Sequence, residues 1–195
     1  MNRADQAGQY ILNRMRNELS GNLSYHNVSH VQDVVNAAIM IGKLEQISED
    51  ELELLKVAAY FHDSGFIIQP DNHEKLSCDI AMEYLPGIGF SESEISTIRK
   101  LIMATRVPQT PTNHLEQIIC DADLDYLGRD DFFTIGNTIY REFISRNVVA
   151  NEKDWNELQV KFLSAHNYFT STSIKLRGPK KEAHLMQIKN LLASY

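Results

Sequence analysis

The chain has 195 residues, of which 43% are hydrophobic and 23% are charged, the proportions of an ordinary globular protein with room for one well-buried domain. The formal net charge of −7 argues against nucleic acid polymers or anionic membranes as partners, whereas a small phosphorylated molecule fits if a bound cation reverses the local field. With only two cysteines there is no disulfide framework, and no apolar run reaches the length of a membrane span, so we expect a cytoplasmic protein.

Apolar residues recur at helical spacing from the first residues onward. The first helix is expected over residues 4–19 and the second from about residue 27. Two capping boxes, Ser48 with Glu51 and Ser91 with Glu94, predict the starts of two further helices. We expect the helix that begins after Ser48 to run into the His62-Asp63 pair and to end at Gly65.

The rest of the chain follows the same helical pattern, and no segment alternates with strand periodicity for more than a few residues. Five more helices are expected, over residues 73–85, 114–126, 131–145, 154–169 and 180–193. Two prolines make the stretch 107–112 a loop, and Gly128 is expected to end its helix. The predicted fold class is therefore all-α.

An imidazole and a carboxylate stand side by side at His62-Asp63, directly after small and aromatic residues. Neither group belongs in an apolar interior without a partner, and a metal ion would supply one to both. Two further histidines, His26 and His30, are four residues apart and share one face if both are helical. These three histidines are therefore candidate functional residues.

An acidic cluster follows at residues 120–128, with carboxylates at the alternate positions Asp121, Asp123 and Asp125. Alternate positions diverge around a helix, so the three side chains cannot all face one ion. Asp123 lies beside the apolar face marked by two leucines, whereas we expect Asp121 and Asp125 at its edges or in solvent. A solvated acidic helix face is therefore the favoured interpretation for Asp121 and Asp125, but not for Asp123.

The order His30, His62-Asp63, Asp123 resembles the signature of the HD superfamily of metal-dependent phosphohydrolases. The resemblance extends from about residue 25 to residue 129 and is strongest to small, single-domain bacterial members, with which residues 61–66 and 121–128 are also shared. It implies one HD domain over residues 1–195, in which a metal-site core of about residues 25–129 carries the C-terminal helices of residues 131–195.

The segment Tyr25-His26-Asn27-Val28-Ser29-His30 is also similar to the Tyr-His-Asn-x-x-His motif of cyclic nucleotide phosphodiesterases. In those enzymes the second histidine binds metal and the first protonates the leaving group. The two resemblances together imply that His30, His62, Asp63 and Asp123 bind one divalent transition metal ion. They also imply that Asp63 orients its water and that His26 is the general acid.

The ligand set of two imidazoles and two carboxylates suits Mn, Fe, Co, Ni or Zn better than Ca or Mg. HD proteins with two metals carry further histidines between the pair and the distal aspartate, and His73 could be one of them. The segment 103–107 contains no histidine, so we expect one ion rather than two. Arg106 and Arg129 are candidate phosphate ligands because they lie near the site in sequence.

These residues predict a metal-dependent phosphohydrolase that cleaves a phosphoester in a nucleotide or a related small phosphorylated molecule. Three alternatives stay open: a cyclic nucleotide phosphodiesterase, a two-iron oxygenase and a non-catalytic module that senses nucleotides. The missing histidine near residue 105 argues against the oxygenase. Neither the substrate nor the choice between monomer and homodimer follows from the ligand residues.

Overall fold

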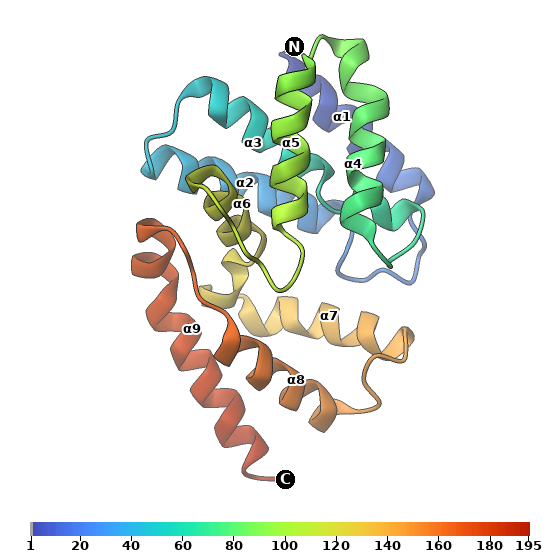
Figure 1. The fold of residues 1–195 in the computed structure, drawn as a ribbon. Helices are drawn as coiled ribbons and strands as arrows, with labels where there is room; N and C mark the ends of the chain where they lie inside the picture. Colours follow the sequence, from blue (N-terminus) through green and yellow to red (C-terminus); the bar gives the residue numbers. More distant parts are fainter. Residues whose placement is uncertain (1) are drawn as a thin grey trace.

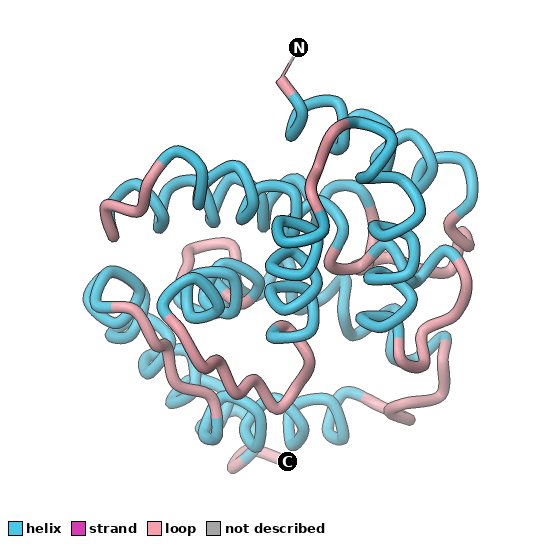
Figure 2. The backbone as a smooth tube through the Cα atoms, turned by 45° about the horizontal axis from the view of Figure 1, so that its top comes forward, coloured by secondary structure: helices cyan, strands magenta, loops and turns pink. Residues whose placement is uncertain are grey.

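The structure, a computed structural model, describes residues 2–195, and every regular element in that range is a helix (Figure 2). The α-helices and short 3-10 helices (η) follow one another as α1 (Arg3–Glu18), α2 (Val28–Leu44), α3 (Glu49–Phe61), η1 (Ser64–Ile67), α4 (His73–Tyr84), η2 (Leu85–Ile88), α5 (Glu92–Ala104), α6 (His114–Asp123), η3 (Asp125–Gly128), α7 (Phe132–Ser145), α8 (Glu152–Ala165) and α9 (Ser171–Leu192). The all-α prediction is confirmed.

Side-chain caps explain where several helices begin. Both predicted capping boxes form, at Ser48 before α3 and at Ser91 before α5. Asn27 caps α2, and its side chain accepts a hydrogen bond from the backbone N–H of Ser29. His26 therefore precedes the helix and does not share a helical face with His30, as it would if both were helical.

The His62-Asp63 pair lies in a turn between α3 and η1, because α3 ends at Phe61 and not at Gly65. The Ser77 hydroxyl on α4 holds this turn, since it accepts from the N–H of Gly65 at 2.8 Å and donates to the carbonyl of His62 at 2.7 Å. A Cβ on Gly65 would collide with the backbone carbonyl of His73. Gly65 thus lets α4 lie directly against the turn.

The helix that contains Asp123 is also shorter than predicted. It ends at Asp123 itself, and a 3-10 turn over Asp125–Gly128 follows. Gly128 permits a close approach, since a Cβ there would collide with the backbone of Arg177 on α9. The four candidate metal ligands therefore lie at or beside helix ends, where the chain changes direction.

The last helix begins at Ser171, nine residues before the predicted start, and contains Pro179. Thr170 caps it with its side chain, and the buried Asp121 carboxylate accepts hydrogen bonds from the backbone N–H of Phe169 and of Thr170 at 2.9 and 2.8 Å. Proline interrupts the sequence pattern of a helix, because it cannot donate a backbone hydrogen bond. The cap and the packing of α9 against η3 outweigh that interruption.

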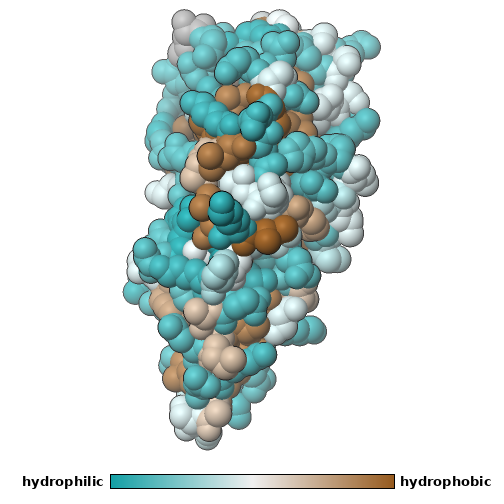
Figure 3. Space-filling model, turned by 90° about the vertical axis from the view of Figure 1, so that its left-hand side faces the viewer, coloured by the Kyte–Doolittle hydropathy of each residue, from teal (hydrophilic) through white to brown (hydrophobic). Residues whose placement is uncertain are grey.

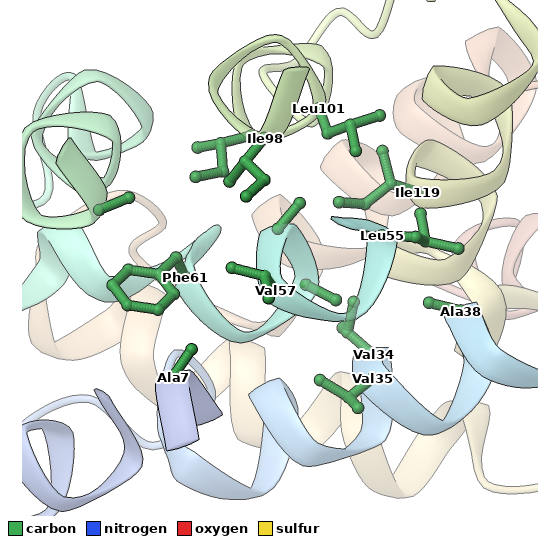
Figure 4. Close-up of a cluster of buried hydrophobic side chains, with 14 of the residues drawn as sticks. Ala7, Val34, Val35, Ala38, Leu55, Val57, Phe61, Ile98, Leu101 and Ile119 are labelled. Carbon is green, nitrogen blue, oxygen red and sulfur yellow. The ribbon is translucent and has the colours of Figure 1, made fainter. Parts of the chain in front are cut away.

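The larger hydrophobic core surrounds α3, which is enclosed by α1, α2, α5 and α6 (Figures 1 and 4). Leu55, Val57 and Phe61 of α3 are completely buried in it. Burying a side chain of this size stabilises the fold by about 1.5–3 kcal/mol. The turn that carries His62 and Asp63 leaves this rigid core directly, so its position is well defined.

A second, smaller hydrophobic cluster joins η3 to α7, α8 and α9, which form the lower part of the molecule in Figure 1. Its buried members include Leu127, Phe132 and Leu163. The first cluster extends to Ala122 and the second starts at Leu124. Asp123 therefore stands where the two cores meet.

The surface is mixed in character. Figure 3 shows one side of the molecule, where hydrophilic residues cover most of the face and apolar residues show between them in small groups. No helix in the range 2–195 combines the length and the apolar character needed to cross a bilayer. Both cysteines, Cys78 and Cys120, are free thiols inside the protein.

Candidate metal centre and cavity

Two imidazoles face each other at the centre of the site. His30, in the first turn of α2, and His62, after α3, are both buried, and their Nε2 atoms are 3.3 Å apart. His62 Nδ1 lies 2.8 Å from the carbonyl of Ala59, which fixes the neutral tautomer with its proton on Nδ1. The lone pair on His62 Nε2 is then free to bind an ion.

Two carboxylates converge on the same pair of nitrogen atoms. Asp63 Oδ2 lies 3.3 Å from Nε2 of each imidazole, and Asp123 Oδ1 lies 3.4 Å from each. The donor atoms of His30, His62 and Asp123 all lie within 4.8 Å of one another. This spacing could hold a metal ion.

The donor set fits a cation for a second reason. Asp63 Oδ2 is buried and has no hydrogen-bond partner within the described part of the chain. An unpaired buried carboxylate oxygen is unfavourable, and this one faces the Nε2 atoms of His30 and His62 at 3.3 Å. A divalent transition ion would satisfy all of these atoms together, and the mixed nitrogen and oxygen set suits Mn, Fe, Co, Ni or Zn.

The ionisation of the four groups shows how strongly the site attracts positive charge. Burial alone would lower the pKa of both imidazoles, but Asp63 and Asp123 raise the pKa of His30 and raise that of His62 well above its ordinary value. Burial would likewise raise the pKa of the carboxyls. The two imidazoles instead lower the pKa of Asp63 well below its ordinary value and that of Asp123 to about 2.

His73 lies on the outer side of Asp63. Its Nε2 is 3.3 Å from Asp63 Oδ1 and 3.6 Å from Glu74 Oε1, and its Nδ1 is 3.0 Å from the carbonyl of Pro70. The structure thus brings His73 to the oxygen of Asp63 that does not face the other two imidazoles. Thr105, on the segment without histidine, also borders the site.

His26 is held beside the cluster by a residue that the sequence did not suggest. Glu142 on α7 is fully buried, pairs with Nδ1 of His26, and accepts from the backbone N–H of Tyr25 at 2.8 Å and of His26 at 3.1 Å. The imidazole of His26 stacks on Phe66 at 4.2 Å. A polar residue among the apolar positions of a helix was the only signal, because 116 residues separate the two partners.

The two candidate phosphate ligands differ in position. Arg106 is exposed and borders the cavity that contains the cluster. Arg129 is bound by carboxylates, with Asp33 at 2.8 Å and Asp131 at 2.7 Å, and it does not border that cavity. The structure brings Arg106 to the site and holds Arg129 in an ion-pair network.

The expectation that Asp121 and Asp125 lie at the helix edges or in solvent was wrong. Asp121 is completely buried and binds the backbone N–H groups of Phe169 and Thr170 just before α9, and Asp125 is 3% exposed and bound by Arg177 through contacts of 2.7 and 3.1 Å. Both acids hold the C-terminal helix in place. Asp123 has the more exposed side chain, at 14%, because it faces the cavity.

The cluster lies at one end of a cavity of about 500 Å³. His26, His30, Asp63, His73, Arg106 and Asp123 border this end. Side chains of α7 and α8 form the other end, among them Ile139, Phe143, Trp155 and Phe162. A small molecule can therefore reach the cluster with one part while another part rests between α7 and α8.

Comparison with known proteins places this geometry in a family. The sequence model of the HD domain matches residues 27–125. A predicted HD superfamily hydrolase from an uncultured Thermotogales bacterium has a similar structure, with a TM-score of 0.61, 23% identity, and 95% of this chain and 91% of that chain covered. Bacillus subtilis YpgQ in complex with ADP has a TM-score of 0.67, 18% identity, and 99% and 95% of the two chains covered.

These structural likenesses, at such low identities, show the shared fold. Among curated proteins, none matches the chain. The similarity of the Tyr25–His30 segment to cyclic nucleotide phosphodiesterases stays a prediction. The family match covers more than half of the chain, from the cap of α2 to the residue after Leu124. With its candidate metal-binding cluster in that span, the chain belongs to the HD domain family of metal-dependent hydrolases.

Proposed function

We propose that this protein is a phosphohydrolase that uses one divalent transition metal ion to cleave a phosphoester in a nucleotide or a related small phosphorylated molecule. The observation that carries the proposal is the convergence of two imidazoles and two carboxylates around the unpaired oxygen of Asp63, at one end of a cavity. The presence of ADP in the similar structure of YpgQ supports a nucleotide as the substrate.

His30, His62, Asp63 and Asp123 would hold the ion. A bound ion of this kind lowers the pKa of a coordinated water and polarises phosphoryl oxygens. Asp63 would hold the ion through Oδ2, and its Oδ1, beside His73, would accept a hydrogen bond from a water and orient it. His73, at 3.3 Å from that second oxygen, contacts phosphate through water or supports a weaker second ion.

His26 would protonate the leaving oxygen. Its Nδ1 is occupied by Glu142, so Nε2 is the nitrogen available to the substrate. Burial alone would raise the pKa of the Glu142 carboxyl, but the bonds from His26 and the backbone lower it, so Glu142 stays ionised and holds the imidazole ring in place. Arg106, at the exposed rim, is placed to attract the phosphate group.

The test is a panel of phosphoesters, including nucleoside mono-, di- and triphosphates and cyclic nucleotides, offered with Mn, Fe, Co, Ni or Zn. We expect release of phosphate, pyrophosphate or a nucleoside product from at least one member, dependent on the ion. Preference for a cyclic nucleotide would select the phosphodiesterase alternative. Tight nucleotide binding without turnover under any of the ions would contradict catalysis and indicate a sensing module.

A further inference from the structure

We infer that the α7–α8 end of the cavity is a subsite for a planar heteroaromatic group, such as a nucleobase, and that Gly136, Trp155 and Gln159 determine this specificity. The inference rests on the proposed function in one respect: the group is carried by the phosphoester that reaches the metal centre. The subsite itself is argued from the walls of the cavity.

Charge is distributed unequally along the cavity. All His, Asp, Glu and Arg side chains that border the cavity come from residues 26–123, the part of the chain that also supplies the candidate metal ligands. The border residues from α7 and α8 include none, within the described chain. The charged part of a ligand is therefore directed to the cluster, and an uncharged part rests between α7 and α8.

Aromatic rings make this uncharged end suited to a flat group. Trp155 is buried, and its ring meets that of Phe143 edge-on at 5.8 Å and 84°. Phe143 and Phe162 are only half-buried, so parts of their rings stay open to the cavity. Flat rings of this kind stack on bases of any sequence, because every base has a π face.

The side-chain amide of Gln159 would favour a heteroaromatic ligand over a plain hydrocarbon. Gln159 Nε2 donates to Asn156 Oδ1 at 3.0 Å, and Asn156 is buried and donates to the Tyr195 hydroxyl at 3.2 Å. This chain of bonds fixes the amide and leaves the other N–H and the carbonyl oxygen of Gln159 for a ligand. An alkyl group would leave them unpaired, whereas the polar edge of a base would pair with them.

Gly136 borders the cavity beside these two side chains. A Cβ added to Gly136 would lie 3.6 Å from Gln159 Oε1 and 3.9 Å from Trp155 Cζ2, which are ordinary contacts. An alanine therefore fits without displacing anything. A leucine would extend past this contact into the cavity that Gly136 borders and take up space that a ring needs.

Trp155 is the only tryptophan in the chain, so its fluorescence reports on this subsite directly. The experiment titrates the metal-loaded protein with adenosine, which has no phosphoester to cleave, and with ribose as a control without the base. We expect saturable quenching by adenosine and none by ribose. Equal responses to both, or stronger binding of 1-hexanol than of adenosine, would overturn the inference.

Matched variants locate the binding. Gly136→Leu should weaken adenosine binding at least tenfold, whereas Gly136→Ala should bind as the wild type does; both residues favour helix more than glycine, so α7 is retained. Gln159→Leu should also weaken adenosine binding, and it provides the test if Gly136→Leu fails to fold. Unchanged binding in Gly136→Leu or, where that variant is unfolded, in Gln159→Leu would refute the assignment.

Measurements of turnover then distinguish a failure of the subsite assignment from a failure of the proposed hydrolysis. The wild type should prefer adenosine monophosphate over ribose 5-phosphate by at least tenfold in kcat/KM, and Gly136→Leu should remove this preference by lowering kcat/KM for adenosine monophosphate. Equal turnover of the two in the wild type would contradict the inference and leave hydrolysis intact. Absence of turnover together with adenosine quenching would contradict hydrolysis and leave the subsite intact.

Discussion

The helices on the two sides of Asp123 are packed differently. In α1–α6, large core side chains such as Phe61, Leu55 and Ile98 are completely buried. Between α7 and α8, Phe143 and Phe162 are only half-buried, and their rings border a cavity of about 500 Å³. The first region supplies all four candidate metal ligands, and the second supplies the opposite end of the cavity.

This difference indicates that metal binding and the binding of an organic group are divided between the two regions. Metal ligands must be held within a fraction of an ångström, which a closed core with fixed turns provides. Binding a variable organic group needs space, which the open packing of α7 against α8 provides. Substitutions in the first region should therefore affect the ion, and substitutions in the second should affect the ligand or the attachment of the C-terminal helices.

The largest effect is expected from His62→Ala, in the closed region. Loss of one imidazole leaves three ligands and an empty space in a buried site, so both bound metal and turnover should fall below detection. Metal content is measured by elemental analysis of the purified variant. His114→Ala is the matched control, because the side chain of His114 is half exposed at the start of α6, and it should keep the ion. Retention of the ion in His62→Ala would contradict the ligand assignment.

A smaller effect is expected where the two regions touch, at His26 and Glu142. Removing a general acid slows turnover by roughly 10²–10⁴-fold, so His26→Ala should lose activity in that range while the ion stays bound. Glu142→Gln should lose less, because the imidazole remains. Adding Glu142→Gln to His26→Ala should have little further effect on kcat, since the two act together. Loss of the bound ion in His26→Ala would contradict the assignment of His26 as the general acid.

Protons should compete with the ion in the closed region. Because the carboxylates raise the pKa of His30 and His62, both imidazoles are protonated below their raised pKa values and must release protons when the ion binds. Metal affinity should therefore rise with pH, by up to about 100-fold per unit where two protons are displaced. Calorimetric titration in buffers of different ionisation enthalpy measures the protons released. An affinity that stays constant between mildly acidic and neutral pH would argue against imidazole ligands.

The smallest of these effects concerns the attachment of α9. Arg177→Met removes the partner of the buried Asp125 carboxylate, although Arg129 remains 3.5 Å away. We expect a loss of about 1–3 kcal/mol in the free energy of unfolding, because a buried acid loses most of its compensation. Denaturant unfolding measures it, with Arg106→Met as an exposed control that should be nearly neutral. A metal content that falls with Arg177→Met would show that the two regions are not separate.

The sequence predicted those features that depend on neighbouring residues. Capping boxes at Ser48 and Ser91 predicted helix starts, and apolar spacing predicted an all-α chain. The choice of Asp123 among three alternate carboxylates came from the family resemblance and from its place beside an apolar face, and the structure turns that side chain toward the imidazoles.

The remaining features depend on contacts between distant segments. The burial of Asp121 and Asp125 follows from α9, which arrives about fifty residues later and supplies the Thr170 cap and Arg177. Glu142 reaches His26 across 116 residues, and no local pattern marks that pairing. The early start of α9 was missed because Pro179 obscures it. The cavity between α7 and α8 exists only in the packed molecule.

The most direct test of the central claim is a crystal structure of the metal-loaded protein with anomalous diffraction recorded at the absorption edge of the bound metal. We predict one strong peak bound by Nε2 of His30, Nε2 of His62 and one oxygen each of Asp63 and Asp123. A peak elsewhere in the molecule, or none in protein that hydrolyses a phosphoester, would contradict the proposed metal centre.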